Sequence, residues 1–123
     1  SLSKGTATEE SRFNPSSPYA ATKAAAELLI NSYFTTFNSD VVITRCTNNY
    51  GPRQFVEKLI PKTIILAYNN KKIPIYGKGT NIRDWIYVDD HCDGVLTAFL
   101  KGKSGESYNF SGNNEINNFI NLY

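Results

Sequence analysis

Four β-branched residues in a row, Val41-Val42-Ile43-Thr44, follow a long Ala-rich segment. A run that is apolar on both faces is typical of a strand in a parallel sheet that helices cover on both sides. The segment from Tyr19 to Phe37 predicts a helix, because Ser17 is a good N-cap and Pro18 suits the first helical turn. A helix followed directly by a buried strand indicates an α/β fold.

Hydrophobic periodicity and turn residues predict the remaining elements. The buried stripe of the first helix should consist of residues at helical spacing, namely Ala26, Ile30, Tyr33 and Phe37. After the first strand we expect a loop at 48–52, a helix at 59–68, strands at 73–76 and 82–88, a helix at 89–101, a strand at 107–110 and the start of a helix from 114 onward. Open α/β sheets present ligand-binding groups at the carboxyl ends of their strands, so the 48–52 loop is predicted to be functional.

The composition excludes several classes of function. The 13 basic and 11 acidic residues are scattered, so no cluster predicts binding to nucleic acid or to a membrane surface. No apolar run approaches the ~18 residues that a membrane span needs. Cys46 and Cys92 lie far apart and outside metal-ligand spacing, which favours two reduced thiols and no metal site. We therefore expect a cytoplasmic protein whose partner is a small molecule.

The strongest chemical signal is a tyrosine and a lysine four residues apart on the first predicted helix, Tyr19 and Lys23. At this spacing the two side chains share one helical face, with their Cβ atoms about 5 to 6 Å apart. A lysine ammonium favours the phenolate form of a nearby tyrosine, which can then accept a proton from a sugar hydroxyl. Spacing alone favours a pair that only packs and contacts solvent, but the surrounding residues change that weighting.

Longer stretches of sequence resemble a known enzyme family. Ser16 to Glu27 is similar to the catalytic helix of the extended short-chain dehydrogenases/reductases. The stretches that resemble the dTDP-glucose 4,6-dehydratase branch of that family are Cys46 to Pro52, Glu57 to Pro61, Pro74 to Gly79 and Arg83 to Trp85. The resemblance implies the later portion of a Rossmann-type NAD-binding domain plus part of a small substrate-binding domain. The NAD-binding region would be 1–51 and 83–111, with a substrate-domain insertion at 52–82 and the start of a truncated substrate-domain helix at 112–123.

The same resemblance implies roles for individual residues. Tyr19 would be the catalytic base, Lys23 would hold the nicotinamide ribose of NAD, and Cys46 and Asn49 would add contacts to the cofactor. The residues that would bind the dTDP-sugar substrate are Asn48, Glu57, Lys58, Leu59, Pro74, Tyr76, Arg83 and Asn118. A guanidinium such as that of Arg83 can donate two parallel hydrogen bonds to a diphosphate. The structural alternatives that stay open are an ion pair for Arg83, a turn for Asn48, a core aromatic for Tyr76 and a solvated position for Asn118.

The function implied by the resemblance is dehydration of dTDP-glucose to dTDP-4-keto-6-deoxyglucose, in a homodimer that pairs through the Tyr19-to-Phe37 helix. One alternative is a sugar-nucleotide epimerase or decarboxylase of the same family, and another is a non-catalytic nucleotide-binding remnant. The chain has neither the family's G-x-x-G-x-x-G turn nor its Thr-Asp-Glu segment, begins without Met and stops inside an amphipathic segment. We therefore expect it to be part of a longer protein and to be inactive on its own.

Overall fold

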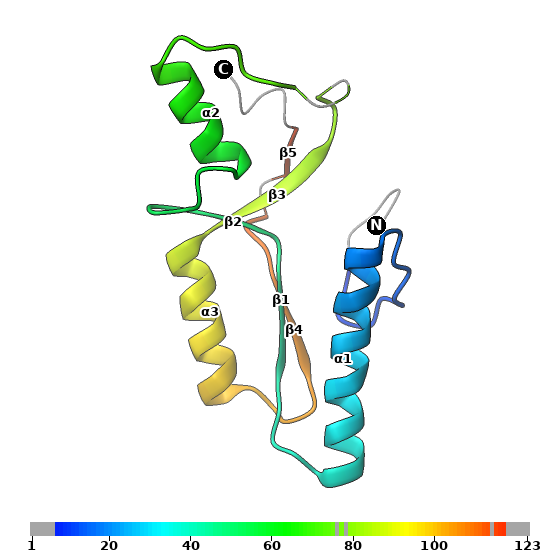
Figure 1. The fold of residues 1–123 in the computed structure, drawn as a ribbon. Coiled ribbons are helices and arrows are strands. Elements are labelled where there is room, and N and C mark those ends of the chain that lie inside the picture. Colours follow the sequence, from blue (N-terminus) through cyan, green and yellow to red (C-terminus); the bar gives the residue numbers. More distant parts are fainter. Residues whose placement is uncertain (1–6, 76, 78, 114, 118–123) are drawn as a thin grey trace. The chain divides into compact units, whose positions relative to one another are not determined.

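The computed structural model describes residues 7–75, 77, 79–113 and 115–117. Its elements in chain order are α1 (Pro18–Phe37), β1 (Ile43–Cys46), β2 (Asn48–Tyr50), α2 (Leu59–Tyr68), β3 (Ile82–Tyr87), α3 (Val88–Lys101), β4 (Ser107–Phe110) and β5 (Glu115–Asn117) (Figure 1). They divide into two compact units, Ser1–Arg45 with Val95–Asn109 and Cys46–Gly94 with Phe110–Tyr123. Helices alternate with strands, some of which pair in parallel, and this arrangement confirms the predicted α/β class.

The bounds of α1 follow from the residues that cap it. The Ser17 side chain accepts a hydrogen bond from the backbone N–H of Ala20 at 3.1 Å, which satisfies one of the helix's free donors. At the other end Asn38 adopts the left-handed conformation, with φ of 51°, and its N–H donates to the carbonyl of Phe34 at 2.9 Å. The predicted start and end of this helix are confirmed.

The first unit is built on the pairing of β1 with β4. The N–H of Ile43 donates to the carbonyl of Glu106 at 3.0 Å, and Ile43 is 5% exposed. α1 lies alongside these strands (Figure 1), and its Phe34 ring lies against the backbone at Gly105. Ala98, near the end of α3, is 6% exposed and completes the small core of this unit.

The predicted buried stripe of α1 is not buried in the single chain. Ile30 is 39% exposed, Tyr33 52% and Phe37 68%, while Ala26 is also exposed. The partly buried residues of α1 lie on another face, and they are Ala20, Ala24, Glu27, Asn31 and Phe34. This face combines Phe34, which lies against Gly105, with a carboxylate that pairs with a guanidinium on β1, and hydrophobic periodicity cannot detect such a pairing.

The second unit contains a sheet with the strand order β2-β3-β5. β2 and β3 pair in parallel, with Asn48 opposite Trp85 and Tyr50 opposite Tyr87. The rings of Tyr50 and Tyr87 pack edge to face with their centroids 5.5 Å apart. β5 pairs antiparallel with β3, and Ile86 of β3, 6% exposed, anchors this unit's core.

The predicted bounds of the other elements agree with the structure in part. α2 and β4 have the predicted limits, and α3 begins at Val88, one residue early. β1 starts at Ile43 because the backbone of Val41 instead bonds the turn at Ser104 and Gly105. The 48–52 loop contains strand β2, because its backbone pairs with β3 despite its polar side chains.

Two further predicted elements in the second unit differ from the structure. Ile73 to Ile75 form no strand, in keeping with the missing N–H of the exposed Pro74, and Tyr76 lies outside the described residues. Glu115–Asn117 form a strand instead of the start of a helix, because they pair with the beginning of β3, and the rest of that predicted helix lies outside the described residues. Cross-strand pairing with a distant segment decides both the presence and the type of these short elements.

The described part of the chain has neither a candidate membrane span nor a candidate metal site. None of its helices is both long enough and apolar enough to traverse a lipid bilayer. Its His, Cys, Asp and Glu side chains form no group of three suited to a metal ion. Cys46 and Cys92 are both exposed as free thiols.

The close approach of Phe34 to Gly105 predicts the effect of a small substitution. Gly105 has φ of 84°, and an added Cβ would lie 2.6 Å from the Phe34 ring. Gly77 has φ of 61° but open space around a Cβ, so Gly77→Ala is a matched control that carries only the backbone strain. In denaturant unfolding of the full-length protein, Gly105→Ala should lower the free energy of unfolding by about 1 to 3 kcal/mol more than the control. Equal losses would mean that Phe34 moves aside without cost.

Candidate functional site

Tyr19 and Lys23 lie in the first turns of α1, on one face of the helix. Tyr19 is 72% exposed, and Lys23 is also exposed. The Lys23 Nζ lies 5.9 Å from the centre of the Tyr19 ring. The structure therefore presents a phenol and an ammonium side by side to solvent, where one ligand can contact both.

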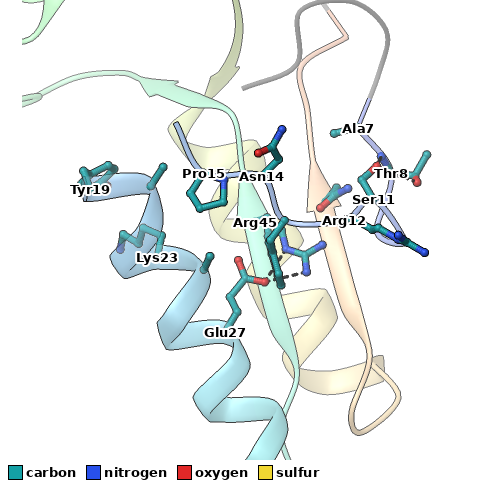
Figure 2. A pocket seen from close by; sticks show the side chains of 14 residues that line it. Ala7, Thr8, Ser11, Arg12, Asn14, Pro15, Tyr19, Lys23, Glu27 and Arg45 are labelled. Atoms are coloured by element: carbon teal, nitrogen blue, oxygen red, sulfur yellow. Dashed lines mark hydrogen bonds and ion pairs between the residues drawn. The ribbon is translucent and has the colours of Figure 1, made fainter. Parts of the chain in front are cut away.

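A cavity of about 540 Å³ adjoins this turn within the first unit (Figure 2). Residues of segment 7–15 form one part of its lining, and Tyr19, Lys23 and Glu27 of α1 form another. Arg45 of β1 and Asn109 of β4 complete it. The volume lies within the range of small-molecule sites, which is roughly 300 to 1,000 Å³.

Arg45 connects three walls of this cavity. Its Nε donates to Oε2 of Glu27 at 2.7 Å, and its Nη2 lies 2.7 Å from the same oxygen. Nη1 donates to the backbone carbonyl of Glu9 at 3.3 Å, and Nη2 to the Ser107 Oγ at 3.4 Å. The guanidinium also lies 5.5 Å from the centroid of the Phe13 ring, in a cation–π contact. One side chain thus joins α1, β4 and segment 7–15.

Glu9 provides a second anchor for segment 7–15. Its Oε1 accepts a hydrogen bond from the backbone N–H of Asn109 at 2.8 Å. That bond and a second one from its own backbone N–H lower the pKa of the Glu9 carboxyl, against an opposing effect of desolvation, and the positive charge of Arg45 lowers it slightly further. The carboxylate is thus held in its ionised form against the edge of β4.

In the second unit, the two residues that are predicted to contact the cofactor, Cys46 and Asn49, lie close together. The Asn49 Nδ2 donates to the Cys46 Sγ at 3.2 Å. Polar atoms that are buried here without a hydrogen-bond partner in the described part of the chain are Thr47 Oγ1, Asn49 Oδ1, Gln54 Oε1 and Trp85 Nε1. Buried polar atoms of native proteins are normally paired, so this group can receive a polar ligand or water.

The predicted substrate residues are spread over the second unit. Asn48 is exposed on β2, next to Asn49. Glu57 and Lys58 are exposed just before α2, and Leu59 begins that helix half-buried. The remaining described ones are Pro74, exposed in the segment after α2, and Arg83, exposed on β3 with Nη1 donating to the Ile82 carbonyl at 2.9 Å. Tyr76 and Asn118 lie outside the described residues.

Reasoning from the sequence missed the ion pair that shapes the cavity. Glu27 follows Lys23 by four residues and Tyr19 by eight, so it lies near the same helical face. Arg45 is a charged, half-buried residue that follows the buried Ile43 and the half-buried Thr44 in β1, and such a charge usually has a partner. These two signals together indicate an ion pair between the helix and the strand.

In sequence, the chain is similar to enzymes that act on nucleotide sugars. Residues 2–111 match the model of the NAD dependent epimerase/dehydratase family. The chain is 48% identical over 111 residues to dTDP-glucose 4,6-dehydratase 1 of Escherichia coli (strain K12), and the match covers 90% of this chain but 31% of that enzyme. The chain therefore spans about a third of the length of the curated relatives that it matches.

Solved structures show the same likeness in three dimensions. The crystal structure of dTDP-glucose 4,6-dehydratase from Bacillus anthracis in complex with NAD matches with a TM-score of 0.95 and 45% identity, over 98% of this chain and 39% of that one. The UDP-glucuronic acid 4-epimerase of Bacillus cereus, in complex with UDP-glucuronic acid and NAD, matches with a TM-score of 0.91 and 31% identity, over 97% and 38%. The fold is thus the one predicted from the sequence, a Rossmann-type α/β arrangement.

The Glu9 anchor predicts a pH-dependent contact. Because its pKa is lowered from 4.5, the bond to Asn109 should be fully present above pH 4.5 and be lost as the pH falls through the lower, folded-state value. In an NMR titration, the Asn109 amide proton should move with that lower midpoint, and Glu9→Gln should flatten the curve. Glu10→Gln, which removes the neighbouring exposed carboxylate, is the control and should change little. An Asn109 midpoint at or above pH 4.5 would contradict the assignment.

Proposed function

The chain belongs to the NAD dependent epimerase/dehydratase family, and on this basis we propose that the whole protein is a dTDP-glucose 4,6-dehydratase. It would convert dTDP-glucose to dTDP-4-keto-6-deoxyglucose by NAD-mediated oxidation at C4, elimination of water across C5 and C6, and reduction at C6. The observation that carries the proposal is the Tyr19 and Lys23 pair beside a cavity of ligand size. Incubation of the full-length protein with dTDP-glucose, followed by product identification, tests it.

The residues assigned to the cofactor have the polarity that a nicotinamide nucleotide requires. The exposed ammonium of Lys23 offers donors for ribose hydroxyls, and it has no carboxylate partner among the described residues. The buried Asn49 Oδ1, beside the Cys46 thiol, is an acceptor that meets no donor from the described residues. When bound, NAD would supply the oxidation at C4 and the returning hydride at C6. We assign Tyr19, Lys23, Cys46 and Asn49 to its site.

Tyr19 is the proposed base for the first step. Its phenol is exposed at the start of α1, so a sugar hydroxyl can approach it without displacing protein atoms. The nearby Lys23 ammonium stabilises negative charge on the phenol oxygen as the proton moves to it. A positioned general base of this kind accelerates proton abstraction by about 10² to 10⁴-fold.

The remaining assignments concern the sugar nucleotide. Arg83 is exposed on a strand, and its planar fork suits the two phosphates. Asn48, beside Asn49 on β2, is proposed to contact the sugar. The other proposed substrate residues are Glu57, Lys58, Leu59 and Pro74, together with Tyr76 and Asn118, which remain predictions from the sequence alone. The division into NAD-binding and substrate-binding regions is likewise part of the proposal.

A 4-epimerase of the same family is the second candidate. The epimerase of Bacillus cereus matches this chain at 31% identity, whereas the Escherichia coli dehydratase reaches 48%. An epimerase shares the base and the oxidation at C4 but eliminates no water. A 4-keto-6-deoxy product from dTDP-glucose would support the dehydratase, and an unreduced 4-epimer would support the alternative.

We propose that the whole protein is a homodimer that pairs through α1, and that it works in the cytoplasm. The apolar side chains Leu29, Ile30, Tyr33 and Phe37 are exposed on this helix in the single chain. An apolar surface of this kind is commonly covered by a partner subunit. The free Cys46 and Cys92 thiols are compatible with a reducing compartment.

Tyr19→Phe should abolish most turnover of the full-length enzyme without unfolding it, because one exposed oxygen is lost and the ring remains. We expect kcat to fall by about 10² to 10⁴-fold with little change in NAD affinity. Tyr33→Phe removes a hydroxyl from the same helix and should keep the parent rate. A Tyr19→Phe rate within about threefold of the parent would remove Tyr19 as the base.

A charge placed on the outward face of α1 should dissociate the proposed dimer. Tyr33→Asp puts a carboxylate where the interface would bury it unpaired, which is costly. Light scattering should then report a monomer at concentrations where the parent is a dimer. Thr35→Asp adds the same charge on a different face of α1 and should leave the dimer intact. A monomeric parent would overturn the assignment of this face.

A further inference from the structure

Lys23 and Glu27 stand four residues apart on α1, the spacing at which a lysine and a glutamate of one helix meet. Glu27 is also the one acidic residue of α1. An ammonium engaged by that carboxylate would be less available to a ligand. Whether the Glu27 carboxylate is already paired therefore decides how available the Lys23 ammonium is to a ligand.

In the structure the Glu27 carboxylate is bound to Arg45 instead. The Arg45 Nε and Nη2 each lie 2.7 Å from Oε2 of Glu27. Figure 2 shows Glu27 directed toward Arg45, while Lys23 is directed to the Tyr19 side of the helix. Two ion pairs occur among the described residues, and Lys23 takes part in neither.

Arg45 has three physical advantages over Lys23 as the partner of Glu27. Its planar guanidinium offers two donors to one carboxylate, whereas an ammonium is a point charge. The Arg45 and Glu27 side chains are 25% and 18% exposed, so solvent and salt screen this pair less than one with the exposed Lys23. The contacts of Arg45 with Glu9, Ser107 and Phe13 also hold it in place, which lowers the entropy lost on pairing.

We propose that Arg45 is a positioning residue that withholds Glu27 from Lys23 and so leaves the Lys23 ammonium free for the ligand. Without Arg45, Glu27 would be a half-buried carboxylate lacking a partner, and Lys23 one turn away is the cation within reach along α1. The consequence for NAD rests on the proposed function. The availability of the Lys23 amine does not rest on the proposed function, and it can be measured separately.

The test compares Arg45→Gln, Glu27→Gln and the double variant in the full-length protein. A limiting amount of an amine-acylating reagent is added, and peptide mass spectrometry gives the rate at which Lys23 is modified. The exposed Lys71 and Lys101 in the same digest control for reagent and handling. Arg45→Gln should slow the modification of Lys23 by about twofold, because an ion-paired ammonium gives up its proton less readily. The double variant should return it to the parent rate.

The Glu27→Gln variant keeps the proposal falsifiable even if Arg45→Gln does not fold. It should leave the modification of Lys23 at the parent rate, since Glu27 is already paired with Arg45 in the parent. Faster modification of Lys23 in this variant would overturn the proposal. Failure of the double variant to restore the rate would also overturn it, because Lys23 would then be slowed although no Glu27 carboxylate is left to pair with it. NAD affinity should fall in Arg45→Gln and stay at the parent value in Glu27→Gln and in the double variant. If Lys23 reactivity changes as expected but NAD affinity does not, the positioning role stands and the assignment of Lys23 to NAD fails.

Discussion

The ion pair between Arg45 and Glu27 determines how α1 lies on the strands of the first unit. None of the residues of α1, all of which the structure describes, is fully buried, so apolar packing alone holds the helix weakly. The pair is mostly shielded from solvent, and it joins the helix to β1 at the level of the cavity. The same guanidinium bonds Glu9 and Ser107. Loss of this one interaction would loosen the helix, segment 7–15 and β4 together.

α1 differs from an ordinary amphipathic helix, because polar residues share its inward face with apolar ones. Its inward face includes Glu27 and Asn31, while Tyr33 and Phe37 point away from the unit and contact each other with ring centroids 5.4 Å apart. A polar residue can face a sheet when its hydrogen bonds are satisfied there, and Arg45 satisfies those of Glu27. The apolar residues left outside are then available to a second subunit. One helix thereby serves both the candidate active site and the proposed dimer.

The second unit depends on backbone pairing in a polar stretch of chain. Asn48 and Asn49 are turn-forming residues, yet they form β2 because β3 offers its edge in parallel register. Pairing satisfies the backbone, and the buried Oδ1 of Asn49 and Nε1 of Trp85 have no hydrogen-bond partner in the part of the chain that the structure describes. Buried polar atoms without partners are costly in a folded chain unless a ligand or water completes them. A ligand that bonds these atoms in the region around β2 would remove this cost.

Interactions within a few residues of one another could be predicted because the sequence displays them directly. Ser17 and Asn38 cap α1 at its two ends, and the four-residue spacing places Tyr19 and Lys23 on one face in any helix. The α/β class and the limits of α2 and β4 follow from similarly local patterns. Interactions between distant segments could not be predicted in this way. Which face of α1 turns inward depends on Arg45, 18 residues beyond Glu27, and a helical periodicity carries no record of a partner on another element.

The short strands β2 and β5 were decided in the same way by tertiary structure. Each has only three residues and little strand propensity, and each exists because β3 lies beside it. A strand of this length gains its hydrogen bonds from the neighbour and not from itself, whereas a helix makes its own. For this reason the sequence alone determined the long helices and the residues they carry, and the folded chain determined which of those residues meet.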